Sequence, residues 1–569
     1  MKKIVLSLFA LLSAVVLFSK EVTPEQAMQY ARKFFSDTPS ARLSLVWKGG
    51  ELSSPAFYVI NRAGGGFLIL SGDDAVTPVM GYSYTGSFET EGMPEQMRGW
   101  FSSLEEDFAT VRRLRPVPSR EVTVAWETLG VRTKAGEKSL LLESAQWDQG
   151  YPYNEKCVMP DGSKAVTGCV ATAMAIVLRY NKYPAHGYGS LRTYTTSTYK
   201  YRIEGYSIED HTYNWDQMPL QVTRSITAEQ IEQISQLIHD CGVMVQMDYS
   251  RGGSGAISMN MPAQISEHMA YSPEALLYRK SMYKPREWID LIKKELQQNR
   301  LVFYSAQDKS GSGGHAFVID GYDENDLLHV NWGWSGHGNA FFNLDLEVDG
   351  YRFSESQGAV LGLVPDPSRT KQAVTYLALT GTGLTLASGR IEEGQTFSLD
   401  VNTITNYGNA AYSGPVVVVL TDENSNIKSQ VSSPKSIEVP ALSSASTSIS
   451  NCKLETKPAF KDRIALAGKN SLTGEYEVLR SDVEAESVGS LATIPNFIAG
   501  KSSYSVGESF SFVLFKSGEK LSSIKWYFDG SLIPADVDSV TLTAGNHVVK
   551  AVINKGNGTE TIVREIEVK

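Results

Sequence analysis

The apolar positions near the N-terminus predict a small α+β unit. Residues 21–36 carry apolar side chains at helical spacing, and Thr23 and Gln26 stand where a capping box would begin that helix. Two apolar runs within residues 57–70 flank a glycine-rich turn, which predicts a β-hairpin. In residues 93–114 aromatic and leucine side chains recur every fourth position, so we expect a second helix there.

The middle of the chain has the mixed pattern of an α+β domain. Residues 115–140 come before it, with Pro116, Pro118 and many charges but no periodicity, so we expect an exposed linker that proteases can reach. Helical and strand patterns then alternate from about residue 144 to 366, a length that suits an enzyme domain. The predicted helices are 170–181, 227–241 and 285–298, and the predicted strands include 301–304, 316–319 and 328–332.

After residue 366 the helical patterns disappear. Short alternating runs such as 397–401 and 524–528 are bounded by Gly, Asn and Ser clusters, which is typical of strands in a β-sandwich. We therefore predict two consecutive immunoglobulin-like β-sandwich modules, at 367–487 and 488–569.

Composition narrows the class of protein. The chain has 569 residues, of which 42% are apolar and 20% charged, so it can bury real cores. Its length suggests about three or four folded units. Its 53 basic and 63 acidic residues give a net charge of −10, and no run of five Lys or Arg residues occurs. Because the basic surface of a nucleic-acid binder is missing, nucleic acid is not an expected partner.

Residues 1–19 have the features of a secretory signal peptide. Lys2 and Lys3 precede an apolar stretch from Ile4 to Phe18. This stretch is shorter than the roughly 20 residues that a helix needs to span a bilayer. We therefore expect a protein that is secreted or displayed at the cell surface.

The four cysteines, Cys157, Cys169, Cys241 and Cys452, are too few to form a disulfide framework in a chain of this size. Gly168 and the small residues after Cys169 predict a buried helix that begins at this thiol, where the helix dipole and unpaired N–H groups favour the thiolate. The alternative is that Cys169 is a small buried hydrophobe, the commoner role of an unpaired cysteine. Cys157 is expected to be a bystander, with regulatory pairing to Cys169 as the alternative.

A histidine and an asparagine favour the catalytic role for Cys169. His315 follows two glycines and enters an apolar strand at a separation of 315 − 169 = 146 residues. This lies within the roughly 130–150 residues between thiol and histidine in one large class of cysteine peptidases. Asn331 stands on the next predicted strand, where its amide oxygen could orient the imidazole while Trp332 shields that bond from water.

Longer motifs surround these residues. They are WDQGYPYN at 147–154, TGCVATA at 167–173, GHAFVIDG at 314–321 and HVNWGW at 329–334. In content, order and spacing these motifs resemble those of the streptopain family of papain-like cysteine peptidases. A weaker similarity to the family's propeptide lies between residues 70 and 82.

The resemblance implies a role for each site residue. Cys169 corresponds to the nucleophile, His315 to the general base and then acid, and Asn331 to the residue that orients the ring. Gln149 matches the position whose side-chain amide joins the backbone N–H of Cys169 in the oxyanion hole. One preorganised donor of that kind is worth roughly 3 to 4 kcal/mol to the transition state.

The resemblance also implies a zymogen. An α+β propeptide at 20–134 would fold on a papain-like peptidase domain at 135–366 and act as its intramolecular inhibitor. The family favours an apolar residue two positions before the scissile bond, which predicts self-cleavage after Arg132 or Glu143. Protein substrates are the expected partners, and we expect neither a metal nor a cofactor.

We predict substrate contacts on both sides of the cleft. They involve Trp332, Trp334, Gly313, Gly314, Gly253 and Ser254. The glycine-rich loop that contains Gly253 matches the substrate-side wall of the family's cleft.

Two alternatives to a protein-cleaving enzyme stay open. In the first, the C-terminal β modules bind a cell-surface or matrix ligand, and the protein is chiefly an adhesin with a weak or inactive peptidase domain. In the second, the same Cys–His machinery performs acyl transfer or amide hydrolysis on a non-protein substrate, because the acyl-enzyme step is shared.

Overall fold

The computed structural model describes residues 19–568 with internal gaps. Those gaps are 92, 94, 115–117, 131–138, 308–313, 345–346, 349–350, 353–356, 382, 390, 392, 423, 457, 459–461, 471–472, 482–490, 493–496, 499–503, 513, 516–522, 536 and 555–558. The expected signal peptide therefore lies almost wholly outside the described residues. The chain forms two compact units, Met1–Gln372 and Ala373–Lys569. Among the described residues, no helix is both long and apolar enough to cross a membrane.

The N-terminal region has the predicted α+β character. Its elements are α1 (Pro24–Phe34), β1 (Leu43–Glu51), β2 (Ser54–Arg62), β3 (Phe67–Ser71), β4 (Val79–Ser83), α2 (Glu95–Leu114) and α3 (Arg120–Glu127). The capping box is confirmed, because the Thr23 hydroxyl accepts the Gln26 N–H at 3.2 Å and Oε1 of Gln26 accepts the Thr23 N–H at 2.8 Å. The predicted hairpin is also confirmed, as β2 paired with β3.

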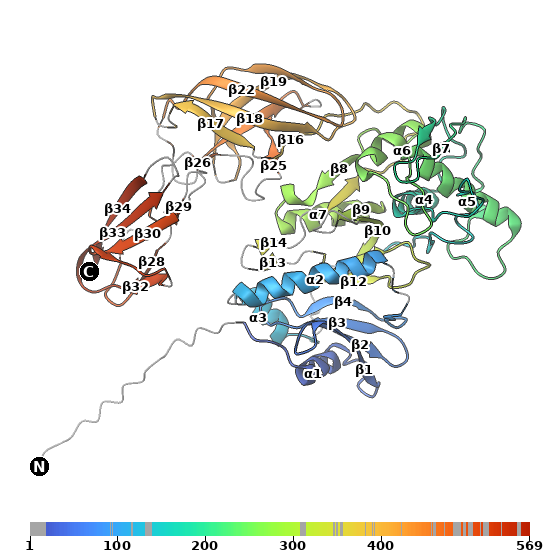
Figure 1. Cartoon of the computed structure of the whole chain (residues 1–569), viewed down its shortest axis with the longest axis horizontal. Coiled ribbons are helices and arrows are strands. Elements are labelled where there is room, and N and C mark those ends of the chain that lie inside the picture. The colour runs from blue at the N-terminus through green and yellow to red at the C-terminus, as the bar shows by residue number, and fades with distance from the viewer. Residues whose placement is uncertain are drawn as a thin grey trace, which may run out of the picture. The chain divides into compact units, whose positions relative to one another are not determined.

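Helices cover both faces of the N-terminal strands (Figure 1). On one face, α1 and α3 pack on β2 and β3 through a core that includes Ala31, Tyr58 and Trp126. On the other face, the ring of Phe101 in α2 lies 4.6 Å from that of Trp47. This region therefore has a core of its own.

The expected linker at 115–140 is partly wrong. Residues Arg120–Glu127 form α3, whose first turn is capped by the Ser119 hydroxyl accepting the Val122 N–H at 3.2 Å. Trp126 is buried and donates its indole N–H to the Val76 carbonyl at 2.8 Å. One buried tryptophan supplies enough apolar contact to fix a short helix that its charged sequence concealed.

The second region of this unit has the predicted mixture of helices and strands. Its elements are β5 (Leu140–Leu141), α4 (Cys169–Asn181), β6 (Tyr194–Thr195), β7 (Arg202–Ile203), α5 (Ala228–Met244), α6 (Met261–Met269), β8 (Leu276–Arg279), α7 (Pro285–Gln297), β9 (Val302–Gln307), β10 (Gly314–Tyr322), β11 (Leu328–Asn331), β12 (Ala340–Phe342), β13 (Glu347–Val348), β14 (Tyr351–Arg352) and β15 (Gly358–Leu361), with 3₁₀ turns at Trp215–Gln217, Ser258–Asn260 and Lys280–Met282. The three predicted helices are confirmed as α4, α5 and α7, and the three predicted strands as β9, β10 and β11. Helix α6 was not expected.

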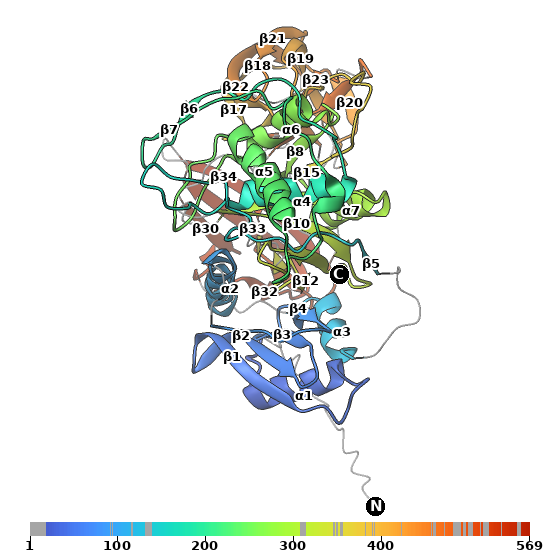
Figure 2. The ribbon, with the colours of Figure 1, turned by 90° about the vertical axis from the view of Figure 1, so that its right-hand side faces the viewer.

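One antiparallel sheet joins the two regions. Among the described residues it has 11 strands in the order β1-β2-β3-β4-β12-β11-β10-β9-β15-β8, with β5 paired to β10. The junction is the pairing of β4 with β12, in which Tyr82 is opposite Phe341 and Gly81 is opposite Phe342. Helix α4 lies beside α5 near β10 (Figure 2) and buries every residue from Cys169 to Arg179.

The C-terminal unit consists of strands. They are β16 (Leu377–Leu379), β17 (Leu384–Gly389), β18 (Thr396–Asn406), β19 (Tyr412–Thr421), β20 (Ile427–Gln430), β21 (Lys435–Val439), β22 (Ser443–Lys453), β23 (Arg463–Lys469), β24 (Tyr476–Val478), β25 (Arg480–Ser481), β26 (Leu491–Ala492), β27 (Phe497–Ile498), β28 (Ser509–Ser511), β29 (Leu514–Phe515), β30 (Ser523–Phe528), β31 (Ser531–Leu532), β32 (Ser539–Thr541), β33 (Gly545–Asn554) and β34 (Thr559–Val568).

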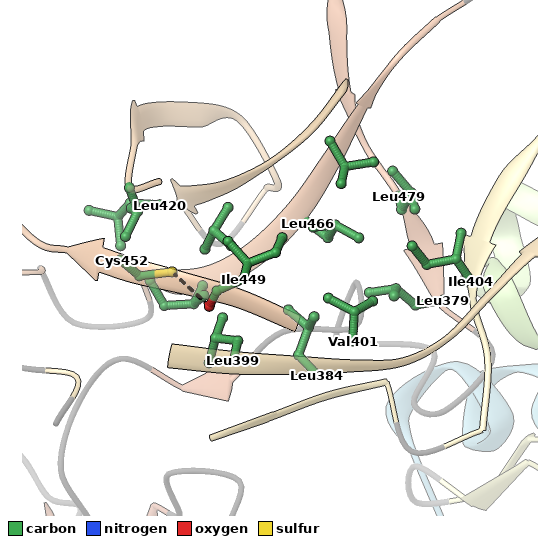
Figure 3. Packing of buried hydrophobic residues seen from close by; sticks show 14 of the residues in the cluster. Leu379, Leu384, Leu399, Val401, Ile404, Leu420, Ile449, Cys452, Leu466 and Leu479 are labelled. Atoms are coloured by element: carbon green, nitrogen blue, oxygen red, sulfur yellow. Dashed lines mark hydrogen bonds between the residues drawn. The ribbon is translucent and has the colours of Figure 1, made fainter. Parts of the chain in front are cut away.

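Among the described residues, two larger cores organise these strands, and a smaller apolar cluster contains Val417, Val419, Ala465 and Ala467. In the first, side chains from the sheet containing β18 and the sheet containing β19, such as Leu399 and Leu420, meet face to face (Figure 3). Cys452 is a buried apolar member of this core, with its thiol 3.7 Å from the Ile449 carbonyl. Strand β26 pairs with β23 and so extends the second of these sheets beyond residue 487. The second core lies among later strands and includes Phe510 and Val549.

Candidate active site

The candidate nucleophile is the first residue of α4. The N-cap Gly168 has φ +87°, and a Cβ at this position would lie 2.5 Å from the Met247 sulfur, so only glycine fits. Cys169 is buried, with 8% of its surface exposed. Burial raises the pKa of its thiol, while backbone N–H groups, that of Ala316 foremost, oppose the rise. The helix start and the beginning of β10 therefore meet at this sulfur.

His315 stands next to Ala316 on β10, so the structure brings the predicted thiol and imidazole segments together. The His315 ring is 7% exposed, and its Nε2 lies 3.0 Å from the Trp332 carbonyl oxygen. A carbonyl can only accept, so Nε2 carries a proton, and in the neutral ring Nδ1 is a free lone pair. Nδ1 is buried and has no hydrogen-bond partner. A base that is oriented on one side and unoccupied on the other suits proton abstraction.

The ring is oriented differently from the expectation. The expected bond from the His315 ring to the Asn331 amide oxygen is replaced by the bond to the Trp332 carbonyl. The amide oxygen of Asn331 instead accepts the Gly333 N–H at 3.1 Å, and its Nδ2 donates to the Ala145 carbonyl at 2.9 Å. A side chain that bonds its neighbour two residues on stabilises a turn. Asn331 thus acts on the backbone around Trp332.

Gln149 lies in the segment next to the nucleophile. Its backbone carbonyl accepts the Thr167 N–H at 3.0 Å, two residues before Cys169. Its side chain is 3% exposed, and Nε2 is buried without a hydrogen-bond partner. An unpaired buried donor costs stability, commonly about 1–3 kcal/mol. An unpaired amide N–H of this kind is suited to donate to an oxygen that arrives only with a bound substrate.

The loop after β11 brings two predicted substrate-contact residues to the site. The rings of Trp332 and Trp334 lie 5.9 Å and 6.2 Å from the His315 ring. Trp334 has a buried indole N–H with no partner. Ser335 donates its hydroxyl to the Asp148 carboxylate at 2.6 Å, which fastens this loop to the segment that carries Gln149.

The other predicted substrate-contact residues are scattered. Gly253 is exposed, and a Cβ there would meet nothing within 4 Å. Ser254 is buried and donates its hydroxyl to the Val166 carbonyl at 2.7 Å, so its visible role is to hold the loop beside the start of α4. Gly314 is exposed at the beginning of β10, and Gly313 lies outside the described residues.

The N-terminal region covers the loop beside the site. The Trp100 ring of α2 lies 6.5 Å from that of Trp332 and 5.1 Å from that of Phe342. A Cβ at Gly338 would lie 2.2 Å from the Met97 methyl group, so α2 and this loop are in close contact. Burial lowers the pKa of His315 to about 4, with the Trp332 carbonyl opposing the shift. Because the thiol pKa is raised as well, the covered site favours a neutral thiol and a neutral imidazole.

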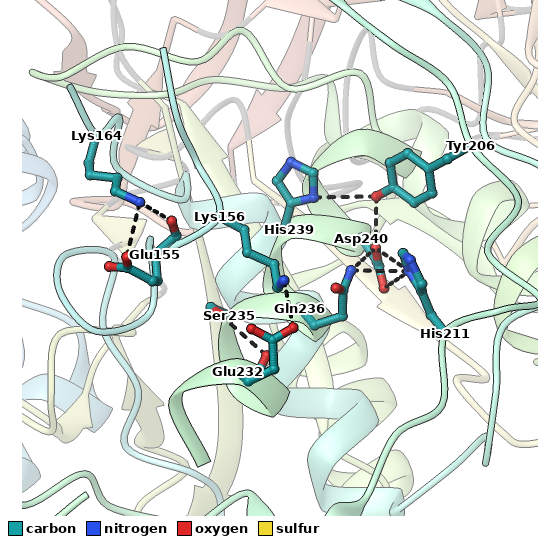
Figure 4. A network of polar contacts seen from close by, with 10 residues as sticks. All are labelled: Glu155, Lys156, Lys164, Tyr206, His211, Glu232, Ser235, Gln236, His239 and Asp240. Atoms are coloured by element: carbon teal, nitrogen blue, oxygen red, sulfur yellow. Dashed lines mark hydrogen bonds and ion pairs between the residues drawn. The ribbon is translucent and has the colours of Figure 1, made fainter. Parts of the chain in front are cut away.

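The buried carboxylate of Asp240 lies in a polar network on α5 (Figure 4). Asp240 of α5 is fully buried and accepts the hydroxyls of Tyr206 at 2.7 Å and Tyr213 at 2.9 Å. It also pairs with Nδ1 of His211 at 3.0 Å and accepts Nε2 of Gln236 at 2.8 Å. The network fixes the segment before α5 against this helix, whose end leads to the Met247 that packs on the N-cap of α4.

Other groups give no sign of further chemistry at this site. Within the described residues, no group of three or more His, Cys, Asp or Glu side chains could hold a metal ion. Cys157 is a free, buried cysteine, and burial raises the pKa of its thiol to about 12. Cys169 is also a free thiol, and no disulfide joins the two.

Two family models match the two regions of this unit. Residues 147–342 match the model of the peptidase C10 family, and residues 19–108 match that of the Spi protease inhibitor. The chain is 32% identical over 410 residues to the thiol protease/hemagglutinin PrtT of Porphyromonas gingivalis, covering 68% of this chain but only 46% of that protein. It is 34% identical over 349 residues to streptopain of Streptococcus pyogenes, covering 57% of this chain and 84% of streptopain.

Among solved structures, a fragment of prointerpain A from Prevotella intermedia is similar, with 26% identity and a TM-score of 0.47 over 57% of this chain and 100% of that one. The matched segments include the motifs around Cys169 and His315, and the inhibitor match coincides with the N-terminal α+β region. The chain thus combines a cysteine peptidase domain, an N-terminal inhibitor-like propeptide region and a C-terminal β-rich region, and it belongs to the peptidase C10 family, the family of streptopain.

Proposed function

We propose that the protein is an exported cysteine endopeptidase that is made as a zymogen and hydrolyses proteins. The observation that carries this proposal is that the segments bearing three groups adjoin one another. A thiol stands at the start of α4, the free Nδ1 of His315 lies on the adjoining strand, and the unpaired amide of Gln149 lies in the segment bonded to Thr167. Each group has the chemical capacity that one step of acyl transfer requires.

In the first half of the reaction, Nδ1 of His315 takes the proton of the Cys169 thiol, and the thiolate attacks the carbonyl carbon of a peptide bond. The imidazolium is stabilised by the Trp332 carbonyl at Nε2. It then gives its proton to the leaving amine, and an acyl-enzyme forms. A water molecule, deprotonated by the same nitrogen, releases the acid product and restores the thiol.

The tetrahedral intermediates carry a negative oxygen. We assign its stabilisation to the side-chain amide of Gln149 and the backbone N–H of Cys169, which is one of the unpaired donors of the first helical turn. The amide has no partner to give up, so it can bind the oxyanion without first breaking a bond. An apolar residue two positions before the scissile bond is the proposed preference, carried over from the family resemblance.

The N-terminal region would hold the enzyme inactive. Its strand β4 continues the peptidase sheet, its helix α2 packs on the loop that follows β11, and the buried Cys169 and His315 are biased toward their neutral forms. Removal of this region would admit water and substrate to the site. Since solvation stabilises charge, the thiolate–imidazolium pair would then become accessible.

Processing should occur before residue 140. A cut after Glu143 would require Leu142 to leave its place, where it is buried and donates its N–H to the Asp320 carbonyl at 2.8 Å. Arg132, the other predicted cut site, lies in the sequence between α3 and β5, outside the described residues. We therefore favour maturation after Arg132 over maturation after Glu143.

Two parts of the proposal rest on sequence. The signal-like residues 1–19 support export, and the alternating patterns support immunoglobulin-like modules in the C-terminal unit. We propose that these modules bind a cell-surface or matrix ligand and hold the peptidase near its substrates. Purified wild-type protein should bind when it is added to cells or matrix, and a variant that lacks residues 373–569 should not bind. This result would support the role.

The test compares wild type with Cys169→Ala. Wild type should convert to a shorter form, digest casein and become labelled by a thiol-reactive peptidyl epoxide. The Cys169→Ala protein should stay full length and unlabelled. If processed wild type neither digests casein nor takes up the label while it still binds cells, the adhesin alternative replaces the proposal. Labelling with turnover of only non-peptide amides would favour the alternative in which the Cys–His machinery acts on a non-protein substrate.

A further inference from the structure

A buried chain of hydrogen bonds connects the segment after the processing region to the strands that carry the site. The Ser144 hydroxyl donates to the Asp320 carboxylate at 2.5 Å and accepts Nδ2 of Asn331 at 2.8 Å. The second oxygen of Asp320 lies 2.5 Å from Nδ1 of His329. Ser144, Asp320 and Asn331 are 9%, 3% and 0% exposed. Both bonding directions of the serine hydroxyl are therefore used inside the protein.

This series of hydrogen bonds ends at the turn whose carbonyl, that of Trp332, orients His315. The Oδ1 of Asn331 accepts the Gly333 N–H at 3.1 Å and so closes a turn around Trp332. The carbonyl of Trp332 is the acceptor for Nε2 of His315 at 3.0 Å. The direction of that carbonyl depends on the turn, and the turn depends on the Asn331 side chain. The amide nitrogen of Asn331 is held by the Ser144 hydroxyl together with the Ala145 carbonyl.

The segment around Ser144 is built into the sheet. Leu140 and Leu141 pair with Tyr322 and Gly321 of β10. A Cβ at Gly321 would lie 2.5 Å from the Leu140 carbonyl oxygen, so the two backbones approach too closely for any larger residue. The position of Ser144 is thus set by backbone pairing just before it.

We propose that Ser144 is a positioning residue for His315, acting through Asn331 and the Trp332 carbonyl. It follows that residues 140–142 must stay paired with β10 for the peptidase to work, because this pairing places Ser144. This inference rests on the proposed peptidase function. It adds Ser144, and the pairing of the segment before Ser144 with β10, to the requirements already set by the thiol, the imidazole and the amide.

The expected consequence of losing the hydroxyl is specific. Without it, one Asp320 oxygen and one N–H of Asn331 lose their partner. Asn331 then keeps only its bonds to the Ala145 carbonyl and the Gly333 N–H, so the turn around Trp332 is held less tightly. A misplaced base costs rate while leaving substrate contacts in place, so we expect kcat to fall about 10-fold to 100-fold with KM nearly unchanged. A weaker bond at Nε2 also stabilises the protonated ring less. The limb of the pH–rate profile that His315 governs should therefore move to lower pH.

The experiment uses the full chain, expressed and allowed to process, with Ser144→Ala, Leu141→Ala and His329→Ala compared with wild type. The side chain of Leu141 on β5 is exposed, and the pairing of this residue with β10 uses backbone atoms that alanine also has. Leu141→Ala therefore keeps the segment in place, so it is the matched control and should keep wild-type kcat. His329 lies at the far end of this series of hydrogen bonds and is partly exposed. His329→Ala should therefore shift the pH–rate profile in the same direction as Ser144→Ala but by less. The measurements are active-site titration, kcat and KM on a peptide substrate, and the pH–rate profile.

The outcomes separate two failures. Inactive wild type contradicts the proposed function and not this inference alone. If wild type is active and Ser144→Ala matches Leu141→Ala in kcat and pH profile, the positioning role is refuted. If Ser144→Ala does not fold, His329→Ala decides: a lowered kcat with a shifted profile supports the proposal, and wild-type kinetics overturn it.

Discussion

Replacing Gln149 by methionine tests the oxyanion hole with little change in shape. The two side chains have similar length and volume, but methionine lacks the N–H donor. In the resting protein Nε2 of Gln149 has no partner, so the substitution breaks no bond at that atom. It instead removes a buried donor that is unpaired, which by itself costs a folded protein about 1–3 kcal/mol.

Activity and stability should therefore change in opposite directions. Loss of one oxyanion donor typically lowers kcat about 100-fold to 1,000-fold, or about 3–4 kcal/mol of transition-state stabilisation. The free energy of unfolding should stay equal or rise by up to about 1–3 kcal/mol. If Gln149 had only a structural role, its substitution would lower kcat and the free energy of unfolding together.

The assay is steady-state hydrolysis of a peptide substrate, with active sites counted by epoxide titration, beside urea unfolding of the same samples. Gln146→Met is the control, since Gln146 lies three residues earlier in the same segment but is exposed. It should keep wild-type kcat. If Gln149→Met retains kcat within about threefold of this control, the assignment of Gln149 to the oxyanion hole is wrong.

Three further predictions concern the β4–β12 junction, the Asp240 network and the residue before Cys169. A Cβ at Gly81 would lie 2.8 Å from the Phe342 ring, so Gly81→Val should loosen the β4–β12 junction. The zymogen should then convert to the shorter form faster, which a gel-shift time course measures. An unchanged conversion rate would mean that this pairing does not hold the propeptide. The bond to Asp240 raises the pKa of His211 above 6.5, so its stabilising contribution is complete below pH 6.5 and is lost as the pH rises through the raised value. Urea unfolding should show this decline in wild type and a flatter dependence in His211→Gln, and equal slopes would contradict it. Gly168→Ala places a side chain at φ +87°, and should cost about 1–3 kcal/mol of unfolding free energy together with most epoxide labelling.

Local patterns predicted the elements that carry the candidate nucleophile and the candidate base. A glycine before a cysteine and a run of small residues indicated a tight helix start, and α4 begins there. Two glycines before a histidine in an apolar run similarly indicated the start of a strand whose backbone another group can approach closely. Strand β10 begins there. Short-range steric rules act on neighbouring residues, so they can be read from neighbouring letters.

The partner of the histidine could not be read in the same way. The sequence pointed to the Asn331 side chain, but the acceptor is the backbone carbonyl of Trp332, and every residue has a carbonyl. The serine that holds Asn331 lies 187 residues away in the chain and carries no motif of its own. Helix α3 was missed for a related reason, since its stability comes from Trp126 packing against a distant segment.

The sequence by itself determined the order of regions, the helix that presents Cys169, the strand that carries His315 and the family to which both point. Those features depend on residue type and on spacing along one segment. Only the tertiary structure decided which atoms orient the imidazole, which side-chain donor in the segment bonded to Thr167 lies unpaired, and that the N-terminal region shares a sheet with the domain it covers. Hydrogen bonds and burial between distant segments depend on their position in space, and that position is set by the packing of the whole unit.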